Sequence, residues 1–226
     1  MRRQDRSMSH VAVIGLGRFG LAVARTLVAQ GHDVLGIDGS EEAVQRAKDV
    51  VTHAVQAVLY EATVVRELGL NAVDAAVVAL GTDMEANIVS TALLVEAGVP
   101  HVVARANSSL HGLILTRVGA HRIVYPEVAS GEAVARSLRA PDVTGHLALG
   151  PETGISTLRA PDGWVGRSVA ELRLPEHGAV TVLAIQRGSQ TLAMPDAVRV
   201  QDGDILALLA HESTLEALPR RAPRRR

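Results

Sequence analysis

A glycine motif near the start of the sequence constrains the fold more than any other feature. The stretch VIGLGRFG, residues 13–20, places glycines at Gly15, Gly17 and Gly20. It follows an apolar run and precedes a run with helical periodicity, so it lies at a strand–loop–helix junction. In such a unit the three glycines allow a tight turn, a close approach of the backbone to a phosphate, and close packing of helix on strand. The motif therefore predicts a nucleotide-binding βαβ unit.

The same alternation continues to residue 126. Short apolar runs predict buried strands at 11–16, 32–38, 52–58, 74–80, 101–105 and 122–126. Helical patterns separate them at 21–30, 41–50, 84–98 and 109–118, with a short helix ending at Gly69. Ser40 is expected to cap the second helix. Alternating strands and helices predict an α/β fold, a Rossmann-like doubly wound parallel sheet with right-handed crossovers.

The pattern changes after Pro126. Residues 127–138 predict one helix, and residues 139–154, which contain proline and glycine, predict a connection. From about residue 145 the apolar segments are short and bounded by turns, which indicates a small α+β lobe. We expect a leader without order at 1–9, a Rossmann domain at 10–126, a crossover helix and linker at 127–145, a second lobe at 146–217, and a basic tail at 218–226.

Composition excludes several classes of function. The formal net charge is −1 and aromatic residues make up 2%, so neither a basic field nor a stacking platform for nucleic acid is present. Cysteine is absent, which rules out disulfides, thiolate catalysis and cysteine-based zinc sites. The start lacks the apolar stretch of a signal peptide, and no apolar run approaches the roughly 18 residues of a membrane span. The tail RRAPRRR is either solvated or attracted to an anionic membrane or acidic partner.

Two charged residues define the expected ligand. Asp38 ends the second strand, where a carboxylate can accept hydrogen bonds from ribose hydroxyls and would repel a 2′-phosphate. NADP is therefore disfavoured. Arg18 lies inside the glycine loop, beside the expected polyphosphate, where a guanidinium can form a bidentate contact. Its position suits ATP or ADP at least as well as NAD.

Nothing in the sequence indicates catalysis with that ligand. A dehydrogenase needs a group that donates or accepts a proton. The histidines after the crossover helix, His146, His177 and His211, stand apart in different local contexts. No Ser-His-Asp, paired-carboxylate or HExxH arrangement is present. We therefore expect a protein that is not an enzyme and has no catalytic residue, with an NAD-dependent oxidoreductase as an open alternative.

Several stretches, in this order, resemble the RCK proteins, the cytosolic regulatory subunits of Ktr- and Trk-type potassium transporters. They are VIGLGRFG, GHDVLGID, VVALGTDMEANI, HVVARAN, GAHRIVYPE and DGDILALLA. The resemblance implies an N-terminal lobe that binds ATP, ADP or NAD(H). It also implies a homodimer made through the crossover helix, and a homo-octamer ring beneath a membrane-embedded potassium channel subunit of the KtrB or TrkH type. The chain would then be cytoplasmic and peripheral at the inner face of the cell membrane. In some members the second lobe binds cyclic di-AMP.

The resemblance also assigns residues. Its phosphate loop matches Gly15, Gly17, Arg18, Phe19 and Gly20, and its ribose acid matches Asp38. Arg105 occupies a place where the family usually has a lysine or arginine. Glu127 matches a glutamate that can hold a divalent cation near the nucleotide, although a helix-start carboxylate favoured by the dipole is an equal interpretation. Ile185 and Arg187 are the candidates for contacts with a cyclic dinucleotide, against a plain sheet-edge role.

The sequence departs from the family at three positions. Val58 replaces an acid or amide near the adenosine, and Tyr60 replaces a threonine. His121 stands where the family usually has an aspartate. The first two departures leave the preferred nucleotide open. A second alternative to the regulatory subunit is a free-standing nucleotide sensor that acts on another cation transporter, such as a proton-coupled exchanger.

Overall fold

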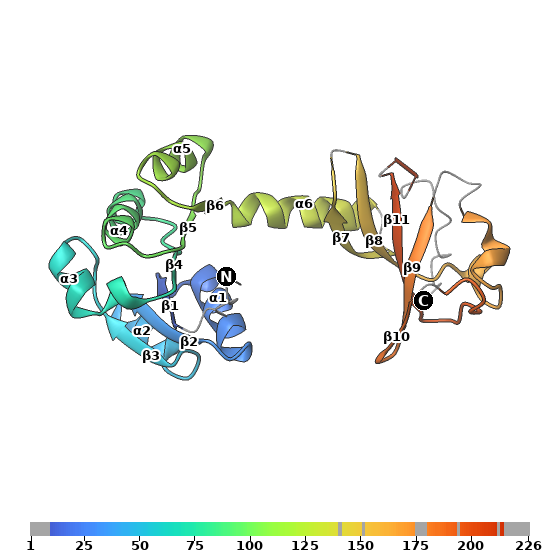
Figure 1. The fold of residues 1–226 in the computed structure, drawn as a ribbon, viewed down its shortest axis with the longest axis horizontal. Coiled ribbons are helices and arrows are strands. Elements are labelled where there is room, and N and C mark those ends of the chain that lie inside the picture. Colours follow the sequence, from blue (N-terminus) through green and yellow to red (C-terminus); the bar gives the residue numbers. More distant parts are fainter. Residues whose placement is uncertain are drawn as a thin grey trace, which may run out of the picture. The chain divides into compact units, whose positions relative to one another are not determined.

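The computed structural model describes residues 10–139, 142–150, 152–174, 180–193, 195–211 and 213–214. The chain forms two compact units that divide between Ala129 and Ser130, inside one helix. Figure 1 shows the elements of each unit. The strands of the first unit are β1 (His10–Ile14), β2 (Asp33–Asp38), β3 (His53–Gln56), β4 (Ala75–Val78), β5 (Val102–Arg105) and β6 (Arg122–Val124). Its helices are α1 (Arg18–Ala29), α2 (Glu41–Ala47), α3 (Ala62–Glu67), η1 (Leu70–Ala72), α4 (Met84–Glu96) and α5 (Ser109–Arg117).

The six strands of the first unit form one parallel sheet in the order β3-β2-β1-β4-β5-β6. This confirms the Rossmann-like fold. The chain runs outward from β1 in one direction and from β4 in the other, so the strand order reverses between these two strands. In open α/β sheets, ligands bind at this reversal, outside the carboxyl ends of the strands. The loop after β1 carries the glycine motif to that place.

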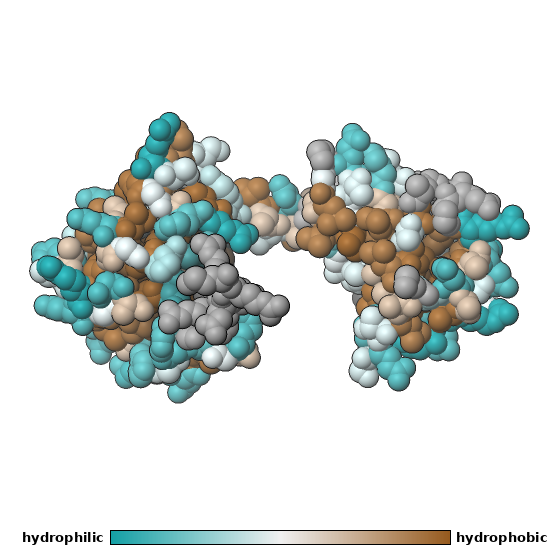
Figure 2. Space-filling view, viewed as in Figure 1, coloured by the Kyte–Doolittle hydropathy of each residue, from teal (hydrophilic) through white to brown (hydrophobic). Residues whose placement is uncertain are grey.

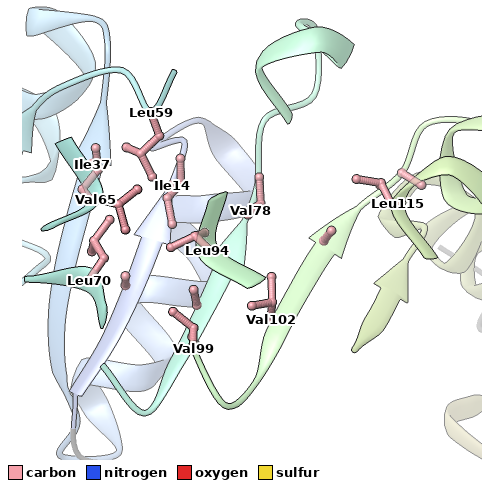
Figure 3. Packing of buried hydrophobic residues seen from close by; sticks show 14 residues of the cluster. Ile14, Ile37, Leu59, Val65, Leu70, Val78, Leu94, Val99, Val102 and Leu115 are labelled. Atoms are coloured by element: carbon pink, nitrogen blue, oxygen red, sulfur yellow. The ribbon is translucent and has the colours of Figure 1, made fainter. Parts of the chain in front are cut away.

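Apolar side chains cover both faces of this sheet. Figure 3 shows the larger cluster, in which Ile14, Ile37 and Val78 of the sheet pack with Leu94 of α4. A second cluster gathers Val13, Leu16 and Val34 with Ala43 and other apolar residues of α1 and α2. Ser40 caps α2 as expected, since its hydroxyl oxygen accepts a hydrogen bond from the Ala43 amide at 3.3 Å. The two cores hold the carboxyl edge of the sheet in place.

Helix α1 begins earlier than its periodicity predicted. It starts at Arg18, so Gly20 lies in its first turn and does not open it. Helix α6 (Pro126–Arg139) follows β6 and contains the boundary between the two units. Within the described part of the chain, no helix combines the length and the apolar composition that a membrane span requires.

The second unit contains a five-stranded antiparallel sheet in the order β10-β9-β11-β8-β7. Its core surrounds the buried side chain of Trp164, together with Leu206 and Leu208 of the central strand. Two short 3-10 helices, η2 (Asp162–Trp164) and η3 (Ala170–Leu172), cover this core. The strands are β7 (Val143–Ala148), β8 (Thr153–Arg159), β9 (Thr181–Arg187), β10 (Gln190–Ala193) and β11 (Ile205–His211).

The connection predicted at 139–154 is wrong in part, because β7 lies within it. This strand is at the edge of the sheet, and most of its side chains are exposed. Its pairing with β8 shifts register between Val143 and Gly145, which interrupts the alternation that marks a half-buried strand. The leader and the basic tail lie outside the described residues.

Helix α6 exposes apolar side chains. Val128, Val134 and Leu138 are 57%, 58% and 80% exposed. Val134 and Leu138 are four residues apart and share one face of the helix. Figure 2 shows apolar surface, drawn brown, on the second unit around the end of α6. Such a face is typical of a helix that packs against another molecule.

Candidate functional site

The glycine loop has the geometry that its spacing predicts. Gly15 adopts a φ of +96°, which only glycine tolerates readily, and turns the chain sharply after β1. A Cβ atom built on Gly20 would overlap the carbonyl oxygen of Gly15, so α1 and the loop are in close contact there. A Cβ on Gly17 would meet no atom within 4 Å. Gly17 is exposed at the start of α1 and leaves the backbone open to an anion at the positive helix end.

Asp38 binds the loop directly. One carboxylate oxygen, Oδ2, accepts a hydrogen bond from the Leu16 amide at 2.7 Å, and Oδ1 accepts one from the Ser40 amide at 2.8 Å. The side chain therefore joins the end of β2 to the phosphate loop. Each carboxylate oxygen has a second lone pair, so both retain the capacity to accept a ribose hydroxyl. Asp38 thus has a structural role in the glycine loop, beside the ribose contact that the sequence predicts.

Val58 and Tyr60 lie on the exposed surface beyond β3. Val58 is 47% exposed and packs against Gly39, since a Cβ on Gly39 would lie 3.0 Å from Val58 Cγ2. Desolvation and the nearby carboxylates of Asp83 and Glu85 raise the pKa of the Tyr60 hydroxyl. The two departures from the family thus put an apolar side chain next to Asp38 and a neutral phenol beside the start of α4.

The structure brings three of the predicted residues together. The Arg105 guanidinium lies over the Phe19 ring, with its Cζ 5.9 Å from the ring centroid. Its Nη2 forms an ion pair with Glu127 Oε1 in the first turn of α6. It also covers Gly81 after β4, because a Cβ there would overlap the guanidinium. Arg105 therefore connects the first turns of α1 and α6 with the loop after β4 at the carboxyl edge. Arg18 is exposed at the start of α1.

Asn87 is a site-supporting residue that the sequence patterns did not single out. It is fully buried on α4, and its Nδ2 donates to the carbonyl oxygens of Leu80 at 2.6 Å and Arg105 at 3.1 Å. It thereby fixes the ends of β4 and β5 relative to each other. Asn87 follows the cap Asp83 by four residues, and Ser90 and Thr91 are buried on the same helix. This run of small polar residues in a helix that packs on the sheet is the signal that could have identified it.

Glu127 was a candidate ligand for a divalent cation. Its carboxylate is 64% exposed and pairs with Arg105. Within the described ranges, no three histidine or acidic side chains come close enough to form a metal site. A cation at Glu127 would need further ligands from a nucleotide or from a second molecule.

The second pair of candidates has structural roles in this chain. Ile185 is completely buried in the core of the second unit. Arg187 donates from Nε to Asp204 Oδ1 at 2.9 Å and from Nη2 to Asp204 Oδ2 at 2.8 Å. The sheet-edge interpretation is wrong, because β9 lies between β10 and β11. Ile185 is therefore closed to a ligand in this structure, whereas Arg187 is engaged by Asp204 and remains 29% exposed.

Two hollows of the surface lie away from the glycine loop. One of about 580 Å³ is in the second unit and is lined by Arg167, Glu171, Leu172 and Arg173. The other, of about 320 Å³, lies beside the amino-terminal ends of β1, β2 and β3, opposite the phosphate loop. The loop itself is an open edge, which agrees with the empty space around Gly17.

Comparisons with known proteins match both units. The family model of the TrkA-N domain matches residues 11–126, and that of the TrkA-C domain matches residues 155–221. The Ktr system potassium uptake protein A of Bacillus subtilis is 32% identical over 208 residues, covering 91% of this chain and 93% of that protein. The protein of the same name from Vibrio alginolyticus is 33% identical over 205 residues, covering 90% and 93%.

Solved structures agree with the fold. The crystal structure of the GsuK RCK domain aligns with a TM-score of 0.65 at 16% identity, covering 97% of this chain and 49% of that chain. The NAD(P)-binding domain of an exopolyphosphatase-related protein from Archaeoglobus fulgidus aligns with a TM-score of 0.51 at 26% identity, covering 59% of this chain and 98% of that one. The second alignment covers a share of this chain about as large as the first unit.

Proposed function

This chain belongs to the TrkA-N/TrkA-C family of Ktr and Trk potassium uptake proteins, and we propose on that basis that it is the nucleotide-binding regulatory subunit of a potassium uptake system. The observation that carries the proposal is the open glycine loop, tied to Asp38 and flanked by Arg18 and Arg105. Its ligand is a nucleotide with a ribose and at least two phosphates: ATP or ADP, with NAD(H) as the other candidate. The NAD(P)-binding domain that resembles this unit supports the same ligand class.

The subunit regulates and does not catalyse. In the described part of the second unit, the buried polar side chains are Ser156 and Asp204. Asp204 is engaged by Arg187, and Ser156, which contacts His146 at 3.0 Å, is only 3% exposed. The support for a regulatory role comes from the relatives, which are named as potassium uptake proteins. In this proposal, bound nucleotide acts as a signal whose effect is a change of shape.

The partner is a membrane-embedded potassium channel subunit, and the regulatory subunit meets it as an assembly. The exposed Val134 and Leu138 of α6 support a homodimer in which this face is buried against a second copy. Dimers of this kind then form a ring, an octamer in the family that the chain resembles. A ligand shifts such a ring only by binding one of its shapes more tightly than another.

Binding tests the first part of the proposal. Calorimetry on the full chain should show binding of ATP, ADP or NAD(H), and Asp38→Ala should weaken all three by about 10- to 100-fold through loss of a charged hydrogen-bond acceptor. Asp33→Asn, at the opposite end of the same strand, is the control and should leave affinity unchanged. Arg18→Ala should weaken ATP more than NAD if the arginine meets the terminal phosphate. A wild-type chain that binds none of the three would refute the proposal.

Flux tests the second part. The chain is reconstituted in liposomes with the membrane subunit that co-purifies with it, and potassium uptake is measured with each nucleotide. Flux that differs between ATP and ADP supports gating, and Arg18→Ala should reduce that difference. Flux that no nucleotide changes would exclude gating, whatever the binding data show. Turnover of a hydroxy acid with NAD would favour an oxidoreductase instead.

A further inference from the structure

Arg105 contacts the loops that follow three other strands of the sheet. Its guanidinium stacks on Phe19 after β1, covers Gly81 after β4 and forms an ion pair with Glu127 after β6. Asn87 holds its backbone carbonyl in place. The Arg105 guanidinium thus lies next to the glycine loop. Its carboxylate partner among the described residues, Glu127, belongs to α6.

The two members of this ion pair are unequally exposed. The Arg105 side chain is 20% exposed, whereas Glu127 is 64% exposed. The Nε of Arg105 is buried and has no hydrogen-bond partner in the described structure, so the guanidinium has unused donor capacity. Glu127 can leave the pair and be hydrated at little cost. Arg105 cannot be left without an anion, because an unpaired charge in a mostly buried position is strongly unfavourable.

We propose that Arg105 exchanges partners: it pairs with Glu127 when the glycine loop is empty and with a phosphate of the nucleotide when the loop is occupied. The inference rests on the proposed function, because it needs a phosphate-bearing ligand at the loop. A phosphate carries more charge than a carboxylate and accepts the two parallel N–H bonds of a guanidinium. Phe19, in the first turn of α1, presents its ring to the same cation.

The exchange couples the ligand to α6. Glu127 lies in the first turn of this helix, which continues past the boundary of the first unit. Phosphate and Glu127 compete for one guanidinium, so each weakens the binding of the other, and the coupling is reciprocal. The first turn of α6 is held to Arg105 when the glycine loop is empty, and it is released when the loop binds a nucleotide.

Competition between Glu127 and a phosphate predicts the direction in which a Glu127 variant changes ADP affinity. A role of Glu127 as a metal ligand predicts a different direction. Without divalent cations, Glu127→Gln removes the competing charge and should tighten ADP binding by about 2- to 5-fold, the range expected for a partly exposed ion pair. A carboxylate that acted only by holding a cation against the phosphates would give no gain in EDTA and a loss in magnesium. Arg105→Gln should weaken ADP by about 10-fold or more.

The experiment is a double-mutant cycle, by calorimetry with ADP in EDTA, on the full-length wild type, Glu127→Gln, Arg105→Gln and the double variant. Glu132→Gln, an exposed carboxylate on the same helix, controls for net charge. Thermal melts check that each variant folds, and Arg105→Lys replaces Arg105→Gln if the latter does not, because lysine keeps the charge without the bidentate geometry.

Tighter binding in Glu127→Gln that disappears in the Arg105 background supports the exchange. Unchanged or weaker binding in Glu127→Gln overturns it and leaves the proposed function intact. A gain that persists without Arg105, or that Glu132→Gln reproduces, also overturns it, because general electrostatics would then explain the effect. A wild type that binds no ADP, ATP or NAD overturns both the exchange and the proposed function.

Discussion

Replacing Arg187 with methionine should destabilise the second unit strongly and in a pH-dependent way. Asp204 is 1% exposed, and both of its oxygens accept hydrogen bonds from the Arg187 guanidinium. In the variant, the side-chain hydrogen bond that remains to this buried carboxylate in the described structure comes from the Gln201 amide, 2.8 Å away. Breaking a buried pair by removing one partner costs about 3–5 kcal/mol. Arg187 is 29% exposed, so water can reach its side of the pair, and we expect about 3 kcal/mol.

The pH dependence follows from the pKa of Asp204. Burial by itself raises this pKa, but the hydrogen bonds from Arg187 and the Gln201 amide, and the attraction to Arg187, outweigh it and hold the pKa below its usual value. In the wild type, the ionised Asp204 therefore stabilises the folded state above the unfolded pKa of about 3.9. This contribution is lost as the pH falls through the lower pKa that Asp204 has in the folded state. In Arg187→Met burial dominates and raises the pKa, so the folded state takes up a proton as the pH falls.

The assay is urea unfolding of the full chain, followed by the fluorescence of Trp164. This residue is the only tryptophan of the sequence and lies in the core of the second unit, so its signal reports that unit. The difference in unfolding free energy between wild type and Arg187→Met should be about 3 kcal/mol at pH 7 and smaller at pH 5. The control Arg159→Gln, at an exposed arginine of β8, should change the unfolding free energy of the wild type by less than about 0.5 kcal/mol. An equal loss at both pH values would refute the reasoning.

Two further variants test the loop and the proposed interface. Gly20→Ala should lower the unfolding free energy by about 1–3 kcal/mol and abolish nucleotide binding, because its Cβ overlaps the Gly15 carbonyl. Gly17→Ala should fold normally and lose only nucleotide affinity, because its Cβ meets no other atom within 4 Å. Equal stability of Gly20→Ala and wild type in urea would contradict this. Val134→Glu should convert a dimer to a monomer in light scattering at micromolar concentration, because it places a charge on the exposed apolar face of α6. Glu132→Gln, on the opposite face, should remain dimeric, and a dimer that survives Val134→Glu would exclude this face as the interface.

The first unit could be predicted from the sequence because its signals are local. Buried parallel strands are continuous apolar runs, and the caps and glycines that bound them act on neighbouring residues. Ser40 and Gly15 have the roles that their residue types and positions predicted. The strand order also follows, because right-handed crossovers and a glycine loop after the first strand leave few alternatives.

The rest depends on contacts between distant residues. Phe19, Arg105 and Glu127 were each singled out through the family resemblance, but no local pattern indicates that they meet over one guanidinium. Arg187 was a candidate for a ligand contact through the family resemblance. Its pairing with the buried Asp204, 17 positions away, has no local signal in the sequence. The start of strand β7 was assigned to the connection, because an edge strand with a register shift lacks a clear alternation there.

The bonds from Asp38 to the Leu16 and Ser40 amides have a consequence for how ligand choice can evolve. A change to a cofactor with a 2′-phosphate requires loss of the carboxylate at this position. Here that loss would also release two backbone amides and loosen the loop that receives the phosphates. A lineage or a protein engineer would have to supply new acceptors for both amides in the same step. A single substitution at Asp38 would therefore change the ligand preference and the stability of the loop together.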